Sequence, residues 1–138
     1  EVNPKTKVIM VDPDGSGLFS YFKTGAFKSE GSSFTEGIGI MRLVENLKQA
    51  KIDDAINLSD QYLYTIGKYV RDHDGIVLGS SSALNVAGAF HTALGAKKGS
   101  KILTFMCDLG ERSYSKMYND EFLNSVSIDT NENIQKYM

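Results

Sequence analysis

Cysteine, histidine, proline and tryptophan are scarce in this sequence. Its 138 residues include one cysteine, two histidines, two prolines and no tryptophan. A single cysteine, Cys107, excludes an internal disulfide framework and suits a reducing compartment, so we expect a cytoplasmic protein. Cys107 closes an apolar run, and we expect it to be a buried structural thiol. Because His73 and His91 are not spaced as zinc ligands, we predict no metal site.

The sequence also lacks a long apolar run and an excess of either charge. No stretch approaches the roughly 18 apolar residues of a membrane-spanning helix, and we expect no contact with a membrane. Fifteen basic residues against seventeen acidic ones give a net charge of −2 without a basic block. This balance argues against a nucleic-acid partner. The length is that of one ordinary domain, which can bury a core without disulfides or metals.

The sequence does contain an alternation of strand-like and helix-like segments. Short apolar runs bounded by glycine, proline or polar residues predict buried strands. Apolar residues at helical spacing begin after Ser59 or Asp60, and again after the serines that end at Ser82. The alternation predicts an α/β fold, with a doubly wound, mostly parallel sheet flanked by helices. The four predicted strands are residues 7–12, 53–59, 76–79 and 100–108.

The remaining segments are less regular. Residues 13–33 read as a long loop whose aromatic side chains argue against disorder. A tight Gly37-Ile38-Gly39 turn precedes a short helix, and residues 111–123 read as one or two helical turns. We predict a single α/β unit over residues 1–123. Residues 124–138 are polar, and we expect them to form a tail that frays.

Three consecutive serines, Ser80 to Ser82, stand where the third predicted strand turns into a helix. In the simplest interpretation Ser81 or Ser82, with Ser82 the better candidate, is an N-cap that stabilises the helix by about 1 kcal/mol. Gly79 would also let the backbone come close to a ligand, and the helix start offers free N–H groups. This place therefore suits a ligand that carries an acceptor atom.

Two other interpretations of these motifs have less support. The G-x-S-x-G elbow of serine hydrolases would require glycine at the position of Ala83 if Ser81 were the nucleophile, and no aspartate and histidine follow at recognisable spacing. The Gly37-Ile38-Gly39 turn lacks the third glycine of the dinucleotide-binding fingerprint. It therefore gives little support to a nicotinamide cofactor.

Five segments follow one another in an order that is typical of a known family. They are KVIMVDPDGSG, TEGIGIMRLVENL, IDDAINLSDQ, GIVLGSSSALNVAGA and CDLGERSYSKMYNDEFL. In order and spacing they resemble the C-terminal half of the cysteine synthase and cystathionine β-synthase family, which belongs with the tryptophan synthase β-like enzymes. These enzymes use pyridoxal 5′-phosphate and have its type II fold. The resemblance extends from about residue 7 to residue 123.

The resemblance implies a transferase or lyase of cysteine biosynthesis that acts as a homodimer on a small amino-acid substrate. The reaction it implies is β-replacement on an activated serine such as O-acetylserine, with sulfide, to give cysteine. The family serine that binds the pyridine nitrogen corresponds to Ser81, and the neutral hydroxyl would leave the ring unprotonated. Gly37, Ile38 and Gly39 match the family loop that closes over cofactor and substrate.

The sequence also departs from the family. Ala83 and Leu84 replace a Gly-Ala pair and could crowd the ring, and Ser113 replaces a tyrosine. The family's Schiff-base lysine and two glycine-rich loops have no counterpart. We therefore expect this chain to be part of a longer enzyme whose N-terminal half carries the lysine, with no catalytic residue and no activity of its own. The alternatives are condensation of serine with homocysteine, and a non-catalytic interaction module that retains the fold.

Overall fold

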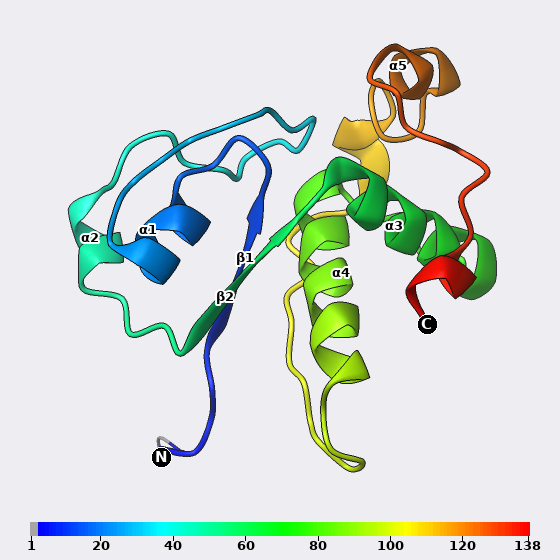
Figure 1. Cartoon of the computed structure of the whole chain (residues 1–138). Helices are drawn as coiled ribbons and strands as arrows, with labels where there is room; N and C mark the ends of the chain where they lie inside the picture. Colours follow the sequence, from blue (N-terminus) through cyan, green and yellow to red (C-terminus); the bar gives the residue numbers. More distant parts are fainter. Residues whose placement is uncertain (1–2) are drawn as a thin grey trace.

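The computed structural model describes residues 3–138, and its centre is a two-stranded parallel sheet that lies between helices (Figure 1). Strand β1 (Ile9–Pro13) pairs with β2 (Asp54–Leu58), and the first residues of the two strands are opposite each other. Parallel strands need a crossover connection. Here the crossover contains helices α1 (Leu18–Thr24) and α2 (Glu45–Lys48). The predicted α/β class with parallel pairing is confirmed.

Two longer helices, α3 (Asp60–Asp74) and α4 (Ser80–Leu94), pack against each other, and α4 contacts both strands. Figure 1 shows α1 and α4 on opposite sides of the strands. Gly88 allows α4 to approach β1 closely, because a methyl group at this position would overlap Val11 of β1. Within residues 3–138, no helix has the length and apolar composition that a membrane crossing requires.

Helix α3 begins and ends where the sequence predicts. The side chain of Ser59 accepts a hydrogen bond from the backbone N–H of Tyr62 at 3.3 Å, which caps the first turn. Gly75 ends the helix with a φ of 72°, a backbone conformation that favours glycine. The inward face of α3 carries Leu63 and Ile66, which are almost fully buried.

Helix α4 begins differently from the prediction. Its N-cap is Gly79, and Ser80, Ser81 and Ser82 are its first three residues. The expectation that Ser81 or Ser82 is the N-cap is therefore wrong. The side chain of Ser82 instead forms hydrogen bonds to Asp108, because the chain returns alongside the helix at that point.

The third and fourth predicted strands do not form among the described residues. Residues 76–79 contribute one isolated antiparallel bridge, from Leu78 to Leu109, which directly follows the fourth predicted strand. Residues 101–107 run beside α4 and are held there by a hydrogen bond of 3.1 Å from Asn85 Nδ2 to the carbonyl of Phe105. Because no neighbouring strand lies beside them in residues 3–138, residues 101–107 form no ladder of backbone hydrogen bonds. Cys107 is consequently exposed, so its expected burial is wrong.

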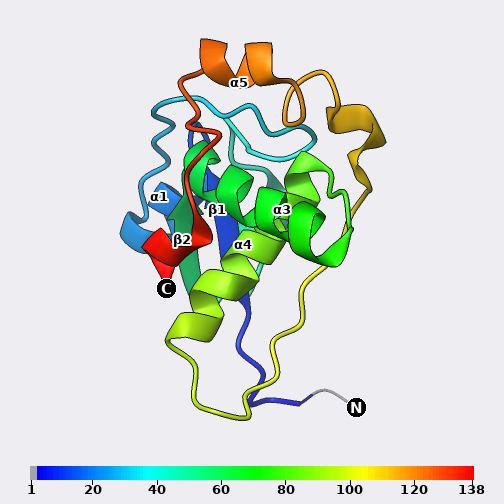
Figure 2. The same ribbon diagram turned by 90° about the vertical axis from the view of Figure 1, so that its right-hand side faces the viewer.

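The predicted loop over residues 13–33 contains helix α1, which Gly25 ends with a φ of 77°. The helical turns expected over residues 111–123 are confirmed as the 3₁₀ helix η1 (Gly110–Ser113) and α5 (Asp120–Ser125). Figures 1 and 2 place the cyan loop before α2 and the golden η1 at one end of the molecule, near the start of α4.

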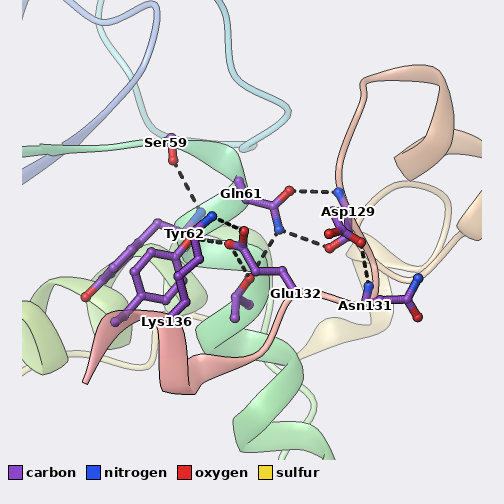
Figure 3. Close-up of polar contacts among 9 residues, drawn as sticks. Ser59, Gln61, Tyr62, Asp129, Asn131, Glu132 and Lys136 are labelled. Atoms are coloured by element: carbon purple, nitrogen blue, oxygen red, sulfur yellow. Dashed lines mark hydrogen bonds and ion pairs between the residues drawn. The ribbon is translucent and has the colours of Figure 1, made fainter.

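The polar tail packs against α3, so the expectation that it frays is wrong. Gln61 of α3 forms two hydrogen bonds with the backbone of Asp129, of 2.7 and 3.0 Å (Figure 3). Ile128 and Ile134 are buried in the core, and the chain finishes in the 3₁₀ helix η2 (Ile134–Tyr137). The polar side chains of this segment thus serve as hydrogen-bond partners while two isoleucines anchor it.

Candidate functional site

The start of α4 is a junction of three segments that are distant in sequence. The backbone N–H of Glu36 donates to Ser80 Oγ at 3.0 Å, which joins the glycine-containing loop to the helix. The N–H of Ser80 donates to Ser113 Oγ at 3.2 Å, which joins η1 to the same turn. The N–H of Gly79 donates to the carbonyl of Asp108 at 3.2 Å. The serine run therefore organises one end of the molecule rather than capping one helix.

All three serine hydroxyls form hydrogen bonds, and two of them bind Asp108. Ser80 Oγ accepts from the N–H of Glu36 in the loop. Ser81 Oγ donates to Asp108 Oδ1 at 3.2 Å, and Ser82 Oγ donates to the carbonyl of Asp108 at 2.7 Å. Ser82 Oγ also lies 3.2 Å from Asp108 Oδ1, to which it can donate, and it accepts from the N–H of Asp108 at 3.0 Å. Ser82 is fully enclosed, whereas Ser81, at 9% exposed, is the most accessible of the three. Ser81 is thus the serine best placed to reach a ligand.

Asp108 supplies the negative charge at this helix start. Its carboxylate lies against the backbone of Gly79, where any side chain on that residue would overlap it. The free N–H groups and the dipole of a helix N-terminus favour an anion. The structure therefore places a carboxylate directly beside the start of α4, bound by the hydroxyls of Ser81 and Ser82.

The Gly37-Ile38-Gly39 turn is anchored at both ends. On one side Glu36 binds Ser80, and on the other the N–H of Ile40 donates to Ser16 Oγ at 3.0 Å. Gly37 and Gly39 have φ values of 74° and 85°, which other residues rarely adopt. The structure therefore brings this predicted site loop beside the serine turn, with Ser80 rather than Ser81 as the link.

A cavity of about 230 Å³ lies between this turn and the loop that follows β1. Ile38 and Gly39 belong to its lining, and Ser81 does not. The remaining lining residues are Pro13, Asp14, Gly15, Gly31, Ser32, Ser33, Thr35 and Met41. The structure thus separates the predicted site residues into a turn that borders a cavity and a serine at the helix start.

Two carboxylates, of which Asp12 is buried and Asp60 half-buried, support the loops around this cavity. Asp12, at the end of β1, accepts a hydrogen bond from the N–H of Phe19 at 2.8 Å, and burial raises its pKa despite hydrogen bonds that act in the opposite direction. Asp60 accepts from the N–H of Phe34 at 2.8 Å and from the hydroxyl of Ser33, and burial again raises the pKa of the carboxyl. Both groups act as fixed acceptors for loop backbone.

The two departures from the family motif have structural explanations. Ala83 is fully buried, and its methyl group lies against Gly67 of α3. It therefore fills the contact between the two helices. Ser113 accepts the first free N–H of α4 from Ser80. Beside it, Lys116 pairs with Glu36 at 2.8 Å, which adds a second connection between η1's segment and the loop.

A second polar cluster joins the tail to α3 and has a structural role. Glu132 accepts hydrogen bonds from Lys136, Tyr137 and Thr65 (Figure 3). Burial and the neighbouring Glu132 raise the pKa of Tyr137 to about 12. Within residues 3–138, the hydroxyl of Tyr62 is buried without a hydrogen-bond partner. This cluster anchors the tail to α3.

Sequence reasoning did not find Ser80, Asp108 and Ser113 as members of the junction. Asp108 had a detectable signal, because an acidic residue at the end of a predicted strand lies where α/β sheets bind ligands. Ser80 and its partners are 44 and 33 residues apart in sequence, at Glu36 and Ser113. No local pattern indicates such contacts.

No protein-family model matches the chain. It is 37% identical over 127 residues to cysteine synthase 2 of Neurospora crassa, a match that covers 83% of this chain and 28% of that protein. It is 34% identical over 142 residues to cysteine synthase of Dictyostelium discoideum, covering 96% and 38%. The solved O-acetylserine dependent cystathionine beta-synthase from Helicobacter pylori has a similar fold. The TM-score is 0.70 and the identity 26%, over 82% of this chain and 35% of that one. The chain thus spans about a third of the length of the curated relatives it matches.

Proposed function

Because the chain belongs to the cysteine synthase and cystathionine β-synthase family, we propose that it is the part of a pyridoxal phosphate enzyme that contacts the cofactor's pyridine nitrogen through Ser81. The fold is that of the type II enzymes, and the match corresponds to their C-terminal portion. The observation that carries the proposal is the bond from Glu36 N–H to Ser80 Oγ. It holds the glycine turn against the helix start where Ser81 lies.

The residues at the helix start suit the ring end of the cofactor. Ser81 offers a neutral hydroxyl, and it is the most accessible of the three serines. The carboxylate of Asp108 lies beside this helix start and would repel a second anion, so we place the cofactor's phosphate elsewhere. When bound, pyridoxal phosphate withdraws electrons from the substrate's α-carbon. Ser81 would hold the ring in place, and Gly37, Ile38 and Gly39 would cover the substrate and exclude water.

The proposed reaction of the longer enzyme is β-replacement on O-acetylserine. In the net reaction, the bond between the β-carbon and the acetate oxygen breaks and acetate leaves. The sulfur of sulfide becomes bonded to the β-carbon, which gives cysteine. The lysine that moves the α-proton would lie outside this chain. We further propose a homodimer in the cytoplasm, a setting to which an exposed, unpaired Cys107 is suited because the cytosol keeps thiols reduced.

A second candidate is condensation with homocysteine. The Helicobacter pylori protein of similar fold is named an O-acetylserine dependent cystathionine beta-synthase, and this favours the same first substrate with a different nucleophile. A third candidate, from another class, is a non-catalytic interaction module that retains the fold, since this chain carries no counterpart of the family lysine.

One experiment separates the three candidates. The longer, lysine-containing enzyme is supplied with O-acetylserine and either sulfide or homocysteine, and cysteine and cystathionine are measured by mass spectrometry. We expect cysteine from sulfide at the higher rate. Predominant cystathionine would support the second candidate, and the lack of both products and of a bound-cofactor spectrum would support the third. The 138-residue chain by itself is expected to bind no cofactor after dialysis and to form no product.

Variants of the serines test the site in the same enzyme. We expect Ser81→Ala to change the absorption spectrum of the bound cofactor and to slow turnover. Ser82→Ala is the matched control, because its hydroxyl is fully enclosed by its bonds to Asp108 and does not face a ligand, so the variant should lower stability and leave the spectrum nearly unchanged. Equal spectral effects of the two variants would contradict the assignment of Ser81.

A further inference from the structure

The Gly37-Ile38-Gly39 turn is held at its two ends by contacts of different kinds. At the Ile40 end, the backbone N–H donates to Ser16 Oγ at 3.0 Å, and the carbonyl accepts from the N–H of Gly17 at 2.9 Å. Ser16 and Gly17 are buried. Between the ends, a methyl group on Gly37 would meet no atom within 4 Å. The position of the turn therefore depends on its two ends rather than on packing around Gly37.

The Glu36 end of the turn is more open to water. The backbone N–H of Glu36 donates to the buried Ser80 Oγ at 3.0 Å, and its carboxylate pairs with Lys116 Nζ at 2.8 Å. The side chains of Glu36 and Lys116 are 47% and 37% exposed. Because ion pairs that water can reach are weak, this end can separate while the buried end stays in place. Ile40 is therefore the pivot of the turn, and Glu36 is the end that opens.

Lys116 lies on a segment that is anchored to the rest of the molecule. Its N–H donates to the carbonyl of Ser113 at 3.1 Å, which closes a turn after η1. The next residue, Met117, is fully buried, and the hydroxyl of Tyr118 donates to the carbonyl of Leu78 at 2.6 Å. The ammonium group of Lys116 thus belongs to an anchored segment, whereas its partner carboxylate belongs to the end of the turn that opens.

We propose that Lys116 is a positioning residue that, through its ion pair with Glu36, holds the glycine turn over the substrate until the nucleophile has been added. The inference rests on the proposed function, in which this turn covers the substrate. The ion pair closes a ring of contacts, because Glu36 also binds Ser80, and Ser80 binds Ser113 in the segment that carries Lys116. Its weakness lets the turn open for the substrate to enter and for the product to leave.

A turn that opens too early gives a different product. If the amino acid leaves after acetate but before the nucleophile arrives, water completes the reaction. In the net reaction, O-acetylserine and water give acetate, pyruvate, ammonium and a proton. The bond from the β-carbon to the acetate oxygen and the bond from the α-carbon to nitrogen both break, and the oxygen of water becomes the keto oxygen of pyruvate. The share of pyruvate therefore measures how often the turn opens early.

Hydrogen exchange of the longer enzyme tests the contact without turnover. Lys116→Met removes the charge and keeps an unbranched side chain, so the amides of residues 36–40 should exchange about threefold faster, the factor expected for an exposed ion pair. Lys116→Arg should restore the wild-type rate. Lys68→Met is the matched control, because Lys68 pairs with Asp72 in α3, outside the ring of contacts, and these side chains are 33% and 48% exposed. It should leave exchange in residues 36–40 unchanged.

The products of the longer enzyme test the consequence for the reaction. With O-acetylserine and sulfide, Lys116→Met should raise the ratio of pyruvate to cysteine about threefold, and Lys116→Arg should restore the ratio. Glu36→Gln breaks the same ion pair and keeps the backbone N–H that binds Ser80, so it should have the same effect. The double variant should show no further increase, because either change by itself removes the pair.

Unchanged exchange in residues 36–40, or an unchanged product ratio, in a folded Lys116→Met variant would overturn the inference. Effects of Lys116→Met and Glu36→Gln that simply add in the double variant would overturn it as well, and so would an equal effect of Lys68→Met. Glu36→Gln decides the matter if Lys116→Met fails to fold. An enzyme whose amides exchange as expected but which forms no cysteine would overturn the proposed function while supporting the anchoring role of Lys116.

Discussion

Two regions that meet at Asp108 have opposite character. The start of α4 is polar and buried, and each of its three serine hydroxyls has a hydrogen-bond partner. Residues 101–107 are apolar and lie in the open, with Leu103 85% and Phe105 71% exposed. Buried polar groups are costly unless they are bonded, and folded monomers rarely expose a continuous apolar run. The hydrogen bonds of the first region are therefore satisfied within this chain. The second region requires a surface to cover its apolar side chains, which residues 3–138 do not supply.

The largest expected effect concerns the exposed apolar run. We predict that the isolated chain self-associates and that the double substitution Leu103→Lys with Phe105→Lys lowers the association constant by roughly a hundredfold, because each side chain contributes about 1.5 kcal/mol when it is buried. Sedimentation equilibrium measures this constant. The control is Met41→Lys with Val126→Lys, which adds the same charge at other exposed apolar positions. If the two double variants lower the association constant equally, the exposed run over residues 101–107 has no special role in self-association, and the prediction is wrong.

The second effect concerns the buried serines. Ser82→Ala should lower the free energy of unfolding by about 2 kcal/mol, because it removes a fully buried hydroxyl that bonds both the N–H and the carbonyl of Asp108. Ser81→Ala removes one longer bond at the edge of the site and should cost less than about 1 kcal/mol. Urea unfolding of the two variants measures the difference. A larger loss for Ser81→Ala would mean that the junction depends on the carboxylate of Asp108 rather than on its backbone.

The third effect extends the comparison to the tail. Tyr137→Phe should lower the free energy of unfolding by about 1 kcal/mol at neutral pH, because it removes the hydrogen bond to Glu132. The pKa of Tyr137 rises from 10.0 to about 12 on folding, so its contribution is fully present below pH 10 and is lost as the pH approaches 12. Unfolding measured across this range should therefore show the wild-type advantage disappearing. An advantage that is constant with pH would argue against the bond.

The smallest effect concerns Asp12, a buried carboxylate with a raised pKa. Because folding raises this pKa above 3.8, ionisation of Asp12 reduces stability as the pH increases through that value. Asp12→Asn keeps an acceptor for the N–H of Phe19 and removes the ionisation. Its stability relative to the wild type should increase from acid to neutral pH in thermal unfolding experiments. A relative loss over this range would show that the carboxylate is stabilised as the anion.

The sequence predicted the elements whose signals are local. Strands β1 and β2 are apolar runs bounded by turn residues, and α3 has a serine cap at one end and a glycine at the other. The apolar runs over residues 76–79 and 100–108 gave the same signal, yet neither has a strand beside it among residues 3–138. A strand exists only when a neighbour accepts its hydrogen bonds, and local pattern carries no information about that neighbour.

By itself, the sequence determined the α/β class, the two long helices, the serine turn and the glycine turn, because propensity, periodicity and turn chemistry act between near neighbours. Only the tertiary structure decided what each serine does. Ser80, Ser81 and Ser82 have the same side chain, and they differ in their partners. Ser80 faces Glu36, Ser81 faces the carboxylate of Asp108, and Ser82 faces both the backbone and the carboxylate of Asp108. Direction around a helix turn and the approach of distant segments set those partners, and both exist only in the folded chain.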